Sequence, residues 1–225
     1  MDLTRRQRYR AETLAEIKQL ALRQIAAGGI EALSLNAIAR DMAVSGAALY
    51  RYFTSRDDLL ADLVVDAYTD LAAVLEAVAA AQYPSPRARM CAITDAYRTW
   101  ALDQPHRYRL AFSSPIGSGQ LAPERVIPAA QHSMNVFLGA VSTIAAGKKA
   151  PRNGVPAELD APLQAWHRRS GGPALPSATL LRGIRCWTRL HGVLSLELDG
   201  HLISAGLDPG LLYKAEVDSL IADIA

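Results

Sequence analysis

Apolar residues recur along most of the chain at spacings of three and four positions, which is the repeat of an amphipathic helix. One face of the first such stretch carries four of them: Leu14, Ile17, Ala21 and Ile25. Gly28 and Gly29 supply the residue type that ends a helix. Thr13 and Glu16 have the spacing of a capping box near its start, with an earlier start of the helix as the alternative. No stretch alternates apolar and polar residues long enough to indicate a strand. The pattern predicts an all-α fold.

The pattern then changes to two short helical segments separated by a tight turn. Ser34 is the expected N-cap of the first, because a serine hydroxyl accepts a hydrogen bond from the first turn of a helix. Ala43 occupies the turn, and Ser45 is the expected N-cap of a second helix from Gly46 to about Phe53. The inward apolar positions are Leu35, Ile38, Ala39, Met42, Val44 and Leu49. This is the arrangement of a DNA-binding helix-turn-helix, although such spacing also arises by chance.

Longer helical patterns fill the rest of the chain. The first opens at Ser55 and Asp58, which have capping-box spacing, and covers roughly residues 56–81. Further helices, each bounded by Pro or Gly, are predicted over residues 86–103, 105–112, 123–145, 177–198 and 208–224. Residues 147–176 are rich in Gly and Pro, which predicts a surface connection with one short helix near Leu159–Arg169.

Composition changes this picture little. Hydrophobic residues make up 50% of the chain and charged residues 20%, as in an ordinary globular protein. No apolar leader and no run of about 18 apolar residues is visible, so we expect a cytoplasmic protein without a membrane span. Cys91 and Cys186 are expected to be small buried residues in a reducing compartment and not a disulfide.

The net charge of +2 alone indicates no nucleic-acid partner, but its distribution is uneven. Residues 1–60 contain nine Lys and Arg against seven Asp and Glu, and the remaining residues contain fifteen of each. Four of the basic residues form an N-terminal arm: Arg5, Arg6, Arg8 and Arg10. Such an arm can contact the phosphates or the minor groove of DNA, or it can be a solvated tail.

The motifs of common enzyme and metal sites are missing from the sequence. There is no Gly-x-Ser-x-Gly, no His-Glu-x-x-His, no Cys-x-x-Cys and no phosphate-binding glycine-rich loop after a strand. The five histidines show no metal-ligand spacing on one helix. We therefore expect no enzymatic activity, no cofactor and no metal, and a helical interaction module is the rival to a DNA-binding protein.

The residues after the turn carry a more specific signal. Residues 48–60 read Ala-Leu-Tyr-Arg-Tyr-Phe-Thr-Ser-Arg-Asp-Asp-Leu-Leu. This run resembles the TetR (TetR/AcrR) family of bacterial regulators, whose recognition helix ends in Leu-Tyr-x-x-Phe, followed by a turn, a basic residue, acids and leucines. The resemblance covers about residues 10–65. Two positions depart from the family pattern: Ala43 stands where glycine is common, and Arg56 stands where lysine is usual.

The resemblance implies a set of DNA-binding residues. These are Ser34, Ser45, Gly46, Ala47, Tyr50, Arg51, Tyr52 and Arg56. The two serines lie at helix N-termini, where N–H groups can hold a phosphate. The two tyrosines and Arg56 resemble the family's phosphate and sugar contacts, with packing as the alternative role of the tyrosines. Ala47 can contact a thymine methyl group, and Arg51 can reach a guanine.

A second resemblance concerns the helix over residues 177–198. Its apolar stripe consists of Trp187, Leu190, Leu194 and Leu198. Trp187 and His191 lie one turn apart, and Gly192 is expected to permit the close approach of another helix. This resembles the Trp-His-Gly signature of one C-terminal subgroup of the TetR family, which implies a dimer interface formed with the last helix. The implied interface residues are Trp187, Leu190, Leu194, Leu198, Leu212 and Leu220.

The large side chains of the C-terminal body are candidates for an effector pocket. The predicted ligand-binding residues are Tyr97, Trp100, Tyr108, Phe137, Trp187 and His191. Each is also a candidate for the packed core, and His191 for a buried structural histidine. Because few polar groups accompany them, the expected effector is small and apolar or aromatic.

The two resemblances together imply a division of labour along the chain. Residues 1–56 form a helix-turn-helix DNA-binding domain, and residues 57–225 form a helical ligand-binding and dimerisation domain. The implied protein is a homodimer that binds a palindromic operator in double-stranded DNA, with repression as the family default and release by an effector. The alternatives are a DNA-binding activator and a dimeric helical interaction module without a small-molecule effector.

Overall fold

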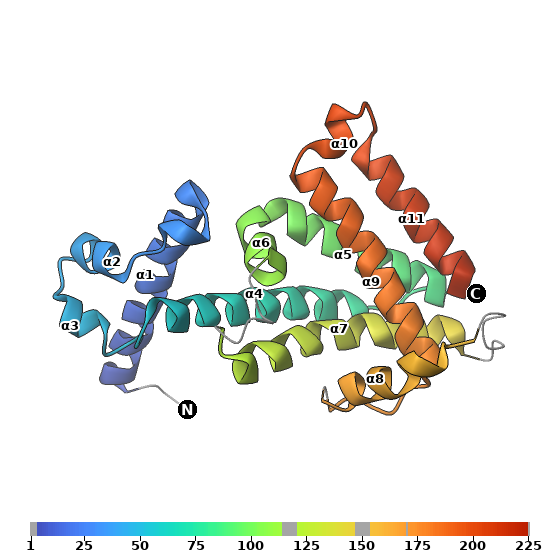
Figure 1. Ribbon diagram of the computed structural model, residues 1–225, viewed down its shortest axis with the longest axis horizontal. Coiled ribbons are helices and arrows are strands. Elements are labelled where there is room, and N and C mark those ends of the chain that lie inside the picture. Colours follow the sequence, from blue (N-terminus) through green and yellow to red (C-terminus); the bar gives the residue numbers. More distant parts are fainter. Residues whose placement is uncertain (1–3, 114–120, 147–153, 170, 225) are drawn as a thin grey trace. The chain divides into compact units, whose positions relative to one another are not determined.

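The computed structural model describes residues 4–113, 121–146, 154–169 and 171–224, and the regular elements among them are all helical (Figure 1). The chain begins with α1 (Arg5–Gly28), the 3₁₀ turn η1 (Ile30–Ala32), α2 (Leu35–Asp41), α3 (Gly46–Leu49) and α4 (Arg56–Ala79). It continues with α5 (Pro86–Asp103), α6 (Pro105–Ser113), α7 (Pro123–Ala145), α8 (Ala157–Arg168), α9 (Ser177–Leu198), α10 (His201–Ser204) and α11 (Pro209–Ile224). The predicted all-α fold is confirmed. None of the described helices is long and apolar enough to cross a membrane.

The chain divides into two compact units. The first comprises Met1–Ala67 with His106–Ile127, and the second comprises Tyr68–Pro105 with Pro128–Ala225. The pair α2 and α3 belongs to the first unit, and α9 to α11 belong to the second. Helices α4 and α7 each contribute residues to both units. The predicted domain boundary after residue 56 stays a prediction.

Helix α1 begins earlier than the predicted capping pair. Its N-cap is Thr4: the Gln7 N–H donates to the Thr4 hydroxyl at 3.3 Å, and the Thr4 N–H donates to the Gln7 side-chain oxygen at 2.8 Å. Thr13, predicted to form a capping box with Glu16, lies inside the helix, where its hydroxyl donates to the Tyr9 carbonyl at 2.9 Å. The predicted capping box at Thr13 is therefore wrong, and the alternative of an earlier start is confirmed. The arginines of the predicted arm are exposed residues of the first turns of α1.

The two predicted N-caps of the helix-turn-helix are confirmed. Each serine hydroxyl accepts a hydrogen bond from the N–H three residues further on, at 3.3 Å for Ser34 and 3.2 Å for Ser45. Helix α3 is shorter than predicted, because the chain after Leu49 winds more tightly. The N–H groups of Arg51 and Tyr52 donate to carbonyls three residues back instead of four.

The turn between α2 and α3 is strained at Ala43. Its φ of 54° lies in the left-handed region, which costs a residue with a Cβ about 1–2 kcal/mol. The Val44 N–H closes the turn by donating to the Ala39 carbonyl at 2.9 Å. Val44 itself is 41% exposed, so the prediction that it points inward is wrong. The other apolar positions of the pair are buried or half-buried.

Helix α4 begins at the predicted residue, Arg56, and ends at Ala79. The Asp58 N–H donates to the Ser55 hydroxyl at 3.0 Å, as the capping-box spacing predicts. The Asp58 carboxylate, however, accepts from the Thr54 N–H at 2.9 Å, one residue before the N-cap. The acid therefore also ties the loop after α3 to the start of α4.

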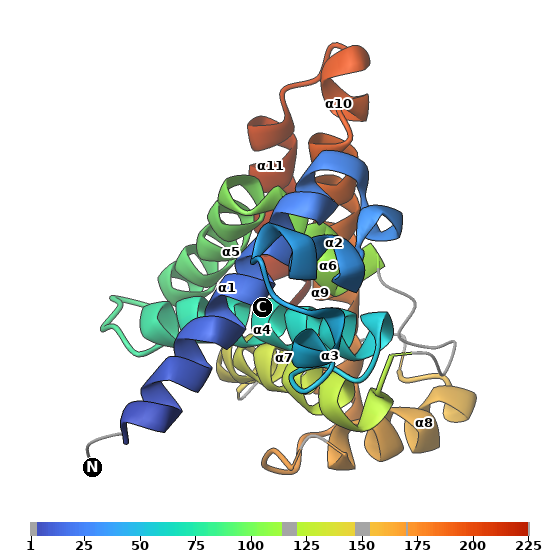
Figure 2. The same ribbon diagram turned by 90° about the vertical axis from the view of Figure 1, so that its left-hand side faces the viewer.

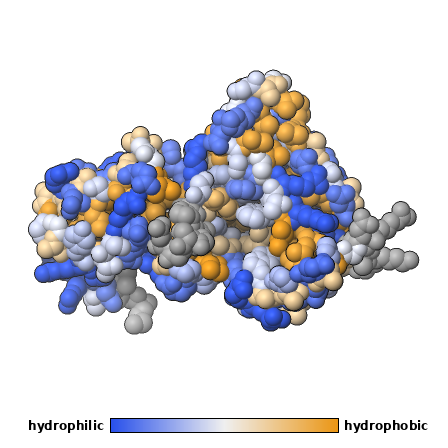
Figure 3. Space-filling model, viewed as in Figure 1, coloured by the Kyte–Doolittle hydropathy of each residue, from blue (hydrophilic) through white to orange (hydrophobic). Residues whose placement is uncertain are grey.

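In the second unit the periodicity and the flanking prolines placed most helices well. Helices α5, α7 and α9 have the predicted bounds, and α8 lies in the predicted connection, of which residues 147–153 and residue 170 are outside the described residues. The predictions lacked η1 and α10, which are too short to show a helical repeat. Helices α9 and α11 lie side by side and run in opposite directions (Figures 1 and 2). Apolar surface gathers around the α10 end of this hairpin (Figure 3).

A close helix approach occurs at Gly183, not at Gly192. A Cβ added at Gly183 would collide with the side chain of Leu138, which lies on α7 and is 1% exposed. A Cβ at Gly192 would meet no atom within 4 Å. No described helix of the same chain comes this close to Gly192, and its predicted role in the close approach of another helix stays a prediction for a second copy.

Both cysteines are free thiols. Cys186 is buried as predicted, and this burial raises its pKa to about 12. Cys91 is half-buried, and burial likewise raises its pKa. Neither thiol is therefore ionised near neutral pH.

Replacing Ala43 with glycine is expected to stabilise the protein by about 0.5–1 kcal/mol. Glycine removes about 1–2 kcal/mol of strain from the left-handed conformation of the folded state. Roughly half of this gain is lost because glycine also gives the unfolded chain more conformational entropy. The exposed Ala47 of α3 is the matched control, because Ala47→Gly should destabilise by about 0.5–1 kcal/mol. Urea unfolding measures both changes, and equal destabilisation by the two glycines would contradict the strain at Ala43.

Candidate DNA-binding interface

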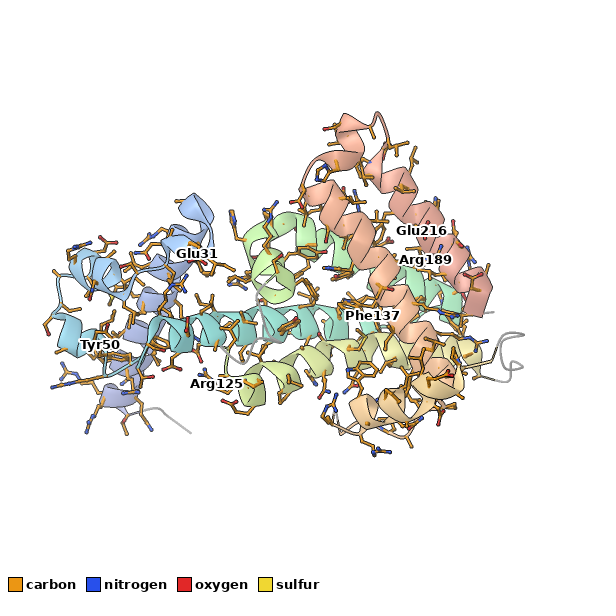
Figure 4. The ribbon with its side chains drawn as sticks, viewed as in Figure 1. Glu31, Tyr50, Arg125, Phe137, Arg189 and Glu216 are labelled. Carbon is orange, nitrogen blue, oxygen red and sulfur yellow. The ribbon has the colours of Figure 1, made fainter. Side chains whose placement is uncertain are left out.

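Helix α3 and the residues just after it expose few polar side chains. Ala47 is exposed, Gly46 is half-buried, and neither has a side-chain donor. Tyr50, just after the helix, is 48% exposed (Figure 4). Arg51 is exposed beside it. This surface offers a methyl group, a phenol and a guanidinium to a partner.

The two serines predicted to bind phosphate set the starts of α2 and α3. Their hydroxyls accept the capping hydrogen bonds described above, and their own O–H groups are donors. The Ser34 N–H donates to the side-chain oxygen of Gln24 on α1 at 2.8 Å. Ser34 is half-buried and Ser45 is exposed, so Ser45 is the more accessible of the two.

Tyr52 is brought together with a residue of the predicted basic arm. The guanidinium carbon of Arg10 lies 5.2 Å from the centre of the Tyr52 ring, which is a cation–π distance. Tyr52 is half-buried and Arg10 is exposed. The sequence indicated neither the contact nor its consequence, which is that α1 holds the tyrosine in place.

Arg56 makes contacts that the sequence did not indicate. Its Nε donates to the Leu33 carbonyl at 3.2 Å, and its NH2 group donates to the Ile30 carbonyl at 2.7 Å. Ion pairs with Glu31 at 3.4 Å and Asp57 at 3.5 Å surround the same guanidinium. Arg56 therefore holds the η1 turn against the start of α4, a contact that spans more than 20 residues and leaves no local signal.

The predicted effector residues fall in both units. Tyr97, Trp100 and Phe137 lie in the second unit and are 1%, 4% and 3% exposed. The Tyr97 and Phe137 rings pack edge to face with their centres 5.6 Å apart. The Trp100 indole N–H donates to Asp70 at 2.8 Å. Tyr108 is buried in the first unit.

Trp187 and His191 are stacked on α9. Their ring centres are 5.5 Å apart and their planes differ by 21°. Both are half-buried. Burial lowers the pKa of His191, so its imidazole is neutral near neutral pH. The pair is thus an aromatic surface without charge.

The leucines predicted for the dimer interface differ in exposure. Leu190 and Leu194 are completely buried within the second unit and Leu220 is 4% exposed, so a partner cannot reach them without rearrangement. Leu198 and Leu212 are half-buried. The exposed apolar side chains of this region, which the prediction lacked, are Leu196, Ile203, Leu207 and Leu211, at 45–69% exposure.

An arginine fastens the two long helices of this region together. The Arg189 Nε on α9 donates to Glu216 Oε2 on α11 at 2.7 Å, and the two side chains point toward one another (Figure 4). A further pair joins Arg189 to Asp223 at 3.2 Å. The α9–α11 hairpin is therefore held by ion pairs at its surface and by leucines inside.

An open groove of about 370 Å³ lies in the second unit along α4, α5 and α7. It is lined by Glu76, Ala79, Ala80, Arg89, His132, Asn135, Val136 and Gly139. The His132 Nε2 lies 2.9 Å from Glu76 Oε1. None of the predicted effector residues lines it. Within the part of the chain that is described, no three His, Cys, Asp or Glu side chains gather in a way that would hold a metal ion.

Comparison with known proteins gives consistent matches along the chain. The family model described as "Bacterial regulatory proteins, tetR family" matches residues 17–63, and that described as "Tetracyclin repressor-like, C-terminal domain" matches residues 90–220. The HTH-type transcriptional regulators Rv1816 of Mycobacterium tuberculosis (strain ATCC 25618 / H37Rv) and Mb1846 of Mycobacterium bovis (strain ATCC BAA-935 / AF2122/97) are each 32% identical over 235 residues. Each match covers 98% of this chain and 96% of the relative.

Solved structures agree with these matches. The crystal structure of SCO4313 is 42% identical, with a TM-score of 0.79, and the match covers 97% of this chain and 100% of that one. A tetR-family regulatory protein from Rhodococcus RHA1 is 19% identical with a TM-score of 0.62, covering 94% and 96%, and shares the fold.

The capped pair of short helices and the all-helical remainder define a DNA-binding transcriptional regulator. With family models matching both parts and relatives 32% identical along nearly the whole chain, the chain belongs to the TetR family. It is a regulator and not an enzyme. The more specific resemblance of Trp187, His191 and Gly192 to the Trp-His-Gly subgroup stays a prediction.

Arg56→Ala is expected to lower the free energy of unfolding by about 1–2 kcal/mol, because two carbonyls at the η1 turn lose a charged donor. Arg56→Lys should recover only part of this, since an ammonium lacks the planar fork that reaches both carbonyls. Arg51→Ala, at an exposed position, is the control and should change stability by less than about 0.5 kcal/mol. Urea unfolding compares the three, and equal stabilities for the two alanine variants would rule out the structural role.

Proposed function

We propose that this chain is a homodimeric repressor, acting in the cytoplasm, that binds a palindromic operator and is released by a small apolar or aromatic effector. The observation that carries the proposal is the helix-turn-helix. Serine caps begin both of its helices, and Ala47, Tyr50 and Arg51 are exposed on and just after α3. A dimer presents two such ends to successive major grooves, about 34 Å apart.

The proposed DNA contacts divide into anchors and readers. The anchors are Ser34, Ser45, Tyr50, Tyr52 and Arg56, whose donors suit phosphate oxygens. Arg56 has this role in addition to its carbonyl contacts. Its Nε and NH2 groups are engaged at the η1 turn, and its NH1 group, which pairs with Asp57 at 3.5 Å, has N–H donors that suit a phosphate. The readers are Gly46, Ala47 and Arg51, of which Arg51 alone carries a side-chain donor.

A mobility-shift experiment with duplex DNA from upstream of the chain's own gene tests the DNA-binding part of the proposal. Binding should weaken steeply as salt rises, because each neutralised phosphate releases counterions. Arg51→Ala should reduce discrimination at one operator position by about 1–3 kcal/mol, whereas Tyr50→Ala should weaken binding to all sequences. An unrelated duplex of equal length is the control. Equal affinity for both duplexes would contradict an operator-reading function.

The proposed dimer interface is the α9–α11 hairpin. Its support is the set of exposed apolar side chains around α10, together with the uncharged Trp187 and His191 stack and the open space at Gly192. Covering large exposed apolar side chains with a partner lowers the free energy. The buried leucines of the hairpin then act indirectly, by holding its two helices together.

Placing a charge in the hairpin surface should separate the proposed dimer. Leu211 is 69% exposed in the single chain, so Leu211→Asp should leave the fold intact while removing apolar contact with a second copy. Leu159→Asp on α8, where the leucine is 41% exposed, is the matched control and should remain dimeric. Sedimentation velocity gives the mass of each variant. A dimeric Leu211→Asp variant would exclude this surface as the interface.

The proposed effector site lies among the buried aromatic residues of the second unit. Tyr97 and Phe137 pack edge to face there, and Trp100 is anchored through Asp70. Aromatic walls with few polar groups suit an apolar or aromatic ligand. A ligand shifts the equilibrium between two conformations only by the difference between its affinities for them. An affinity about 100-fold higher for one conformation shifts this equilibrium by about 2.7 kcal/mol.

A further inference from the structure

The first turn of α7 is joined by one arginine to two aspartates of α4. The Arg125 NH1 group donates to Asp58 Oδ1 at 2.8 Å, and its NH2 group donates to Asp62 Oδ1. The second oxygen of each carboxylate is used elsewhere. Asp58 Oδ2 accepts from the Thr54 N–H at 2.9 Å, and Asp62 Oδ2 lies 2.6 Å from the Lys18 Nζ. Each aspartate therefore links Arg125 to a different part of the chain.

The two linked parts are those that lead into and out of the helix-turn-helix. Lys18 lies in α1, which precedes it, and Thr54 lies in the loop that leads from α3 to α4. All the residues of this network belong to the first unit, and their charged side chains are 22–36% exposed. Charge-assisted hydrogen bonds with partial burial and two-oxygen geometry are stronger and more directional than exposed ion pairs.

The ionisation of the network agrees with its geometry. The Thr54 N–H, followed by its hydroxyl and Arg125, holds the pKa of Asp58 below its usual value, against the effect of burial. Burial acts to lower the pKa of Lys18, but its bonds to Asp62 and Asp66 outweigh that effect and raise it. Asp58 and Lys18 are therefore charged at neutral pH, as their ion pairs require.

The first turn of α7, which carries Arg125, differs from the rest of that helix. Pro128 lies inside the helix and has no N–H, so α7 lacks the hydrogen bond that would run to the Glu124 carbonyl near its start. The division of the chain into two units falls at the same place, so that Pro123–Ile127 belongs with the helix-turn-helix. Val126, in this turn, is completely buried.

We propose that Arg125 is a positioning residue for DNA binding. By binding one oxygen of the Asp62 and Asp58 carboxylates, it holds the other oxygen toward Lys18 of α1 and Thr54 of the loop after α3, and so sets the orientation in which α3 meets DNA. This rests on DNA binding by the chain and is independent of the effector and of the dimer surface. A direct contact between Arg125 and a phosphate is the competing explanation.

The two explanations predict opposite effects for Asp62→Asn. If Arg125 is a phosphate contact, removing a nearby negative charge strengthens DNA binding. If Arg125 positions α1 through Asp62, the same change weakens binding, because the link to Lys18 loses its charge. We expect both Arg125→Gln and Asp62→Asn to weaken DNA binding by about tenfold. Arg125→Lys should have an affinity between those of the wild type and Arg125→Gln, because an ammonium group lacks the planar fork that binds both carboxylates.

Fluorescence anisotropy with duplex DNA from upstream of the chain's own gene measures these affinities in the full-length protein. The matched control is Arg87→Gln, because Arg87 also lies in the first turn of a helix that begins with proline and is paired with an aspartate, Asp218. It should change affinity by less than about twofold. Stronger binding by Asp62→Asn, or unchanged binding by Arg125→Gln, would overturn the proposal.

Amide hydrogen exchange without DNA separates a failure of this proposal from a failure of DNA binding. In Arg125→Gln, segments containing Thr54 and the middle of α1 should exchange at least about fivefold faster, while α9 and α11 keep their rates. The Arg87→Gln variant should leave the Thr54 segment unchanged. Unchanged exchange around Thr54 and Lys18 in Arg125→Gln would overturn the proposal even if the duplex is not bound.

Discussion

The burial of α4 is the constraint on which the rest of the structure depends. Ten of its side chains are between 0% and 5% exposed: Leu59, Leu60, Ala61, Leu63, Val64, Ala67, Tyr68, Leu71, Ala72 and Leu75. Because so much of its surface is apolar and covered, the rotation of the helix about its axis is fixed. The polar side chains then occupy the narrow strip that remains. Asp58, Asp62 and Asp66 recur every four residues along this strip, and their partners Lys18 and Arg125 come from α1 and α7.

Most helix positions were predictable from local signals along the chain. Ser34 and Ser45 mark helix starts because capping is a contact over three residues, and prolines mark the starts of α5 and α7. The same reasoning failed at Thr13, whose capping spacing is real but lies inside a longer helix. A local pattern shows that a residue is able to cap a helix, but it does not show which of several such residues is the N-cap.

Contacts between distant residues were the part that sequence reasoning did not reach. The hydrogen bonds of Arg56 to Ile30 and Leu33 join segments more than 20 residues apart, and nothing in their spacing indicates them. The family resemblance found Arg56 as a candidate for DNA contact, whereas the structure adds its support of the η1 turn. The dimer prediction met the same limit, because an apolar stripe does not reveal that Leu190 and Leu194 face inward while Leu211 faces outward.

The close approach at Gly183 has a consequence for how this protein can vary. The Leu138 side chain fills the space that a side chain at position 183 would need, so the combined volume of the two side chains is limited. Enlarging one requires shrinking the other, because the surrounding core is densely packed. Among relatives that keep this crossing of α7 and α9, positions 138 and 183 should therefore change together. Covariation of these two positions, which are 45 residues apart in the chain, would then indicate how closely α7 and α9 pack.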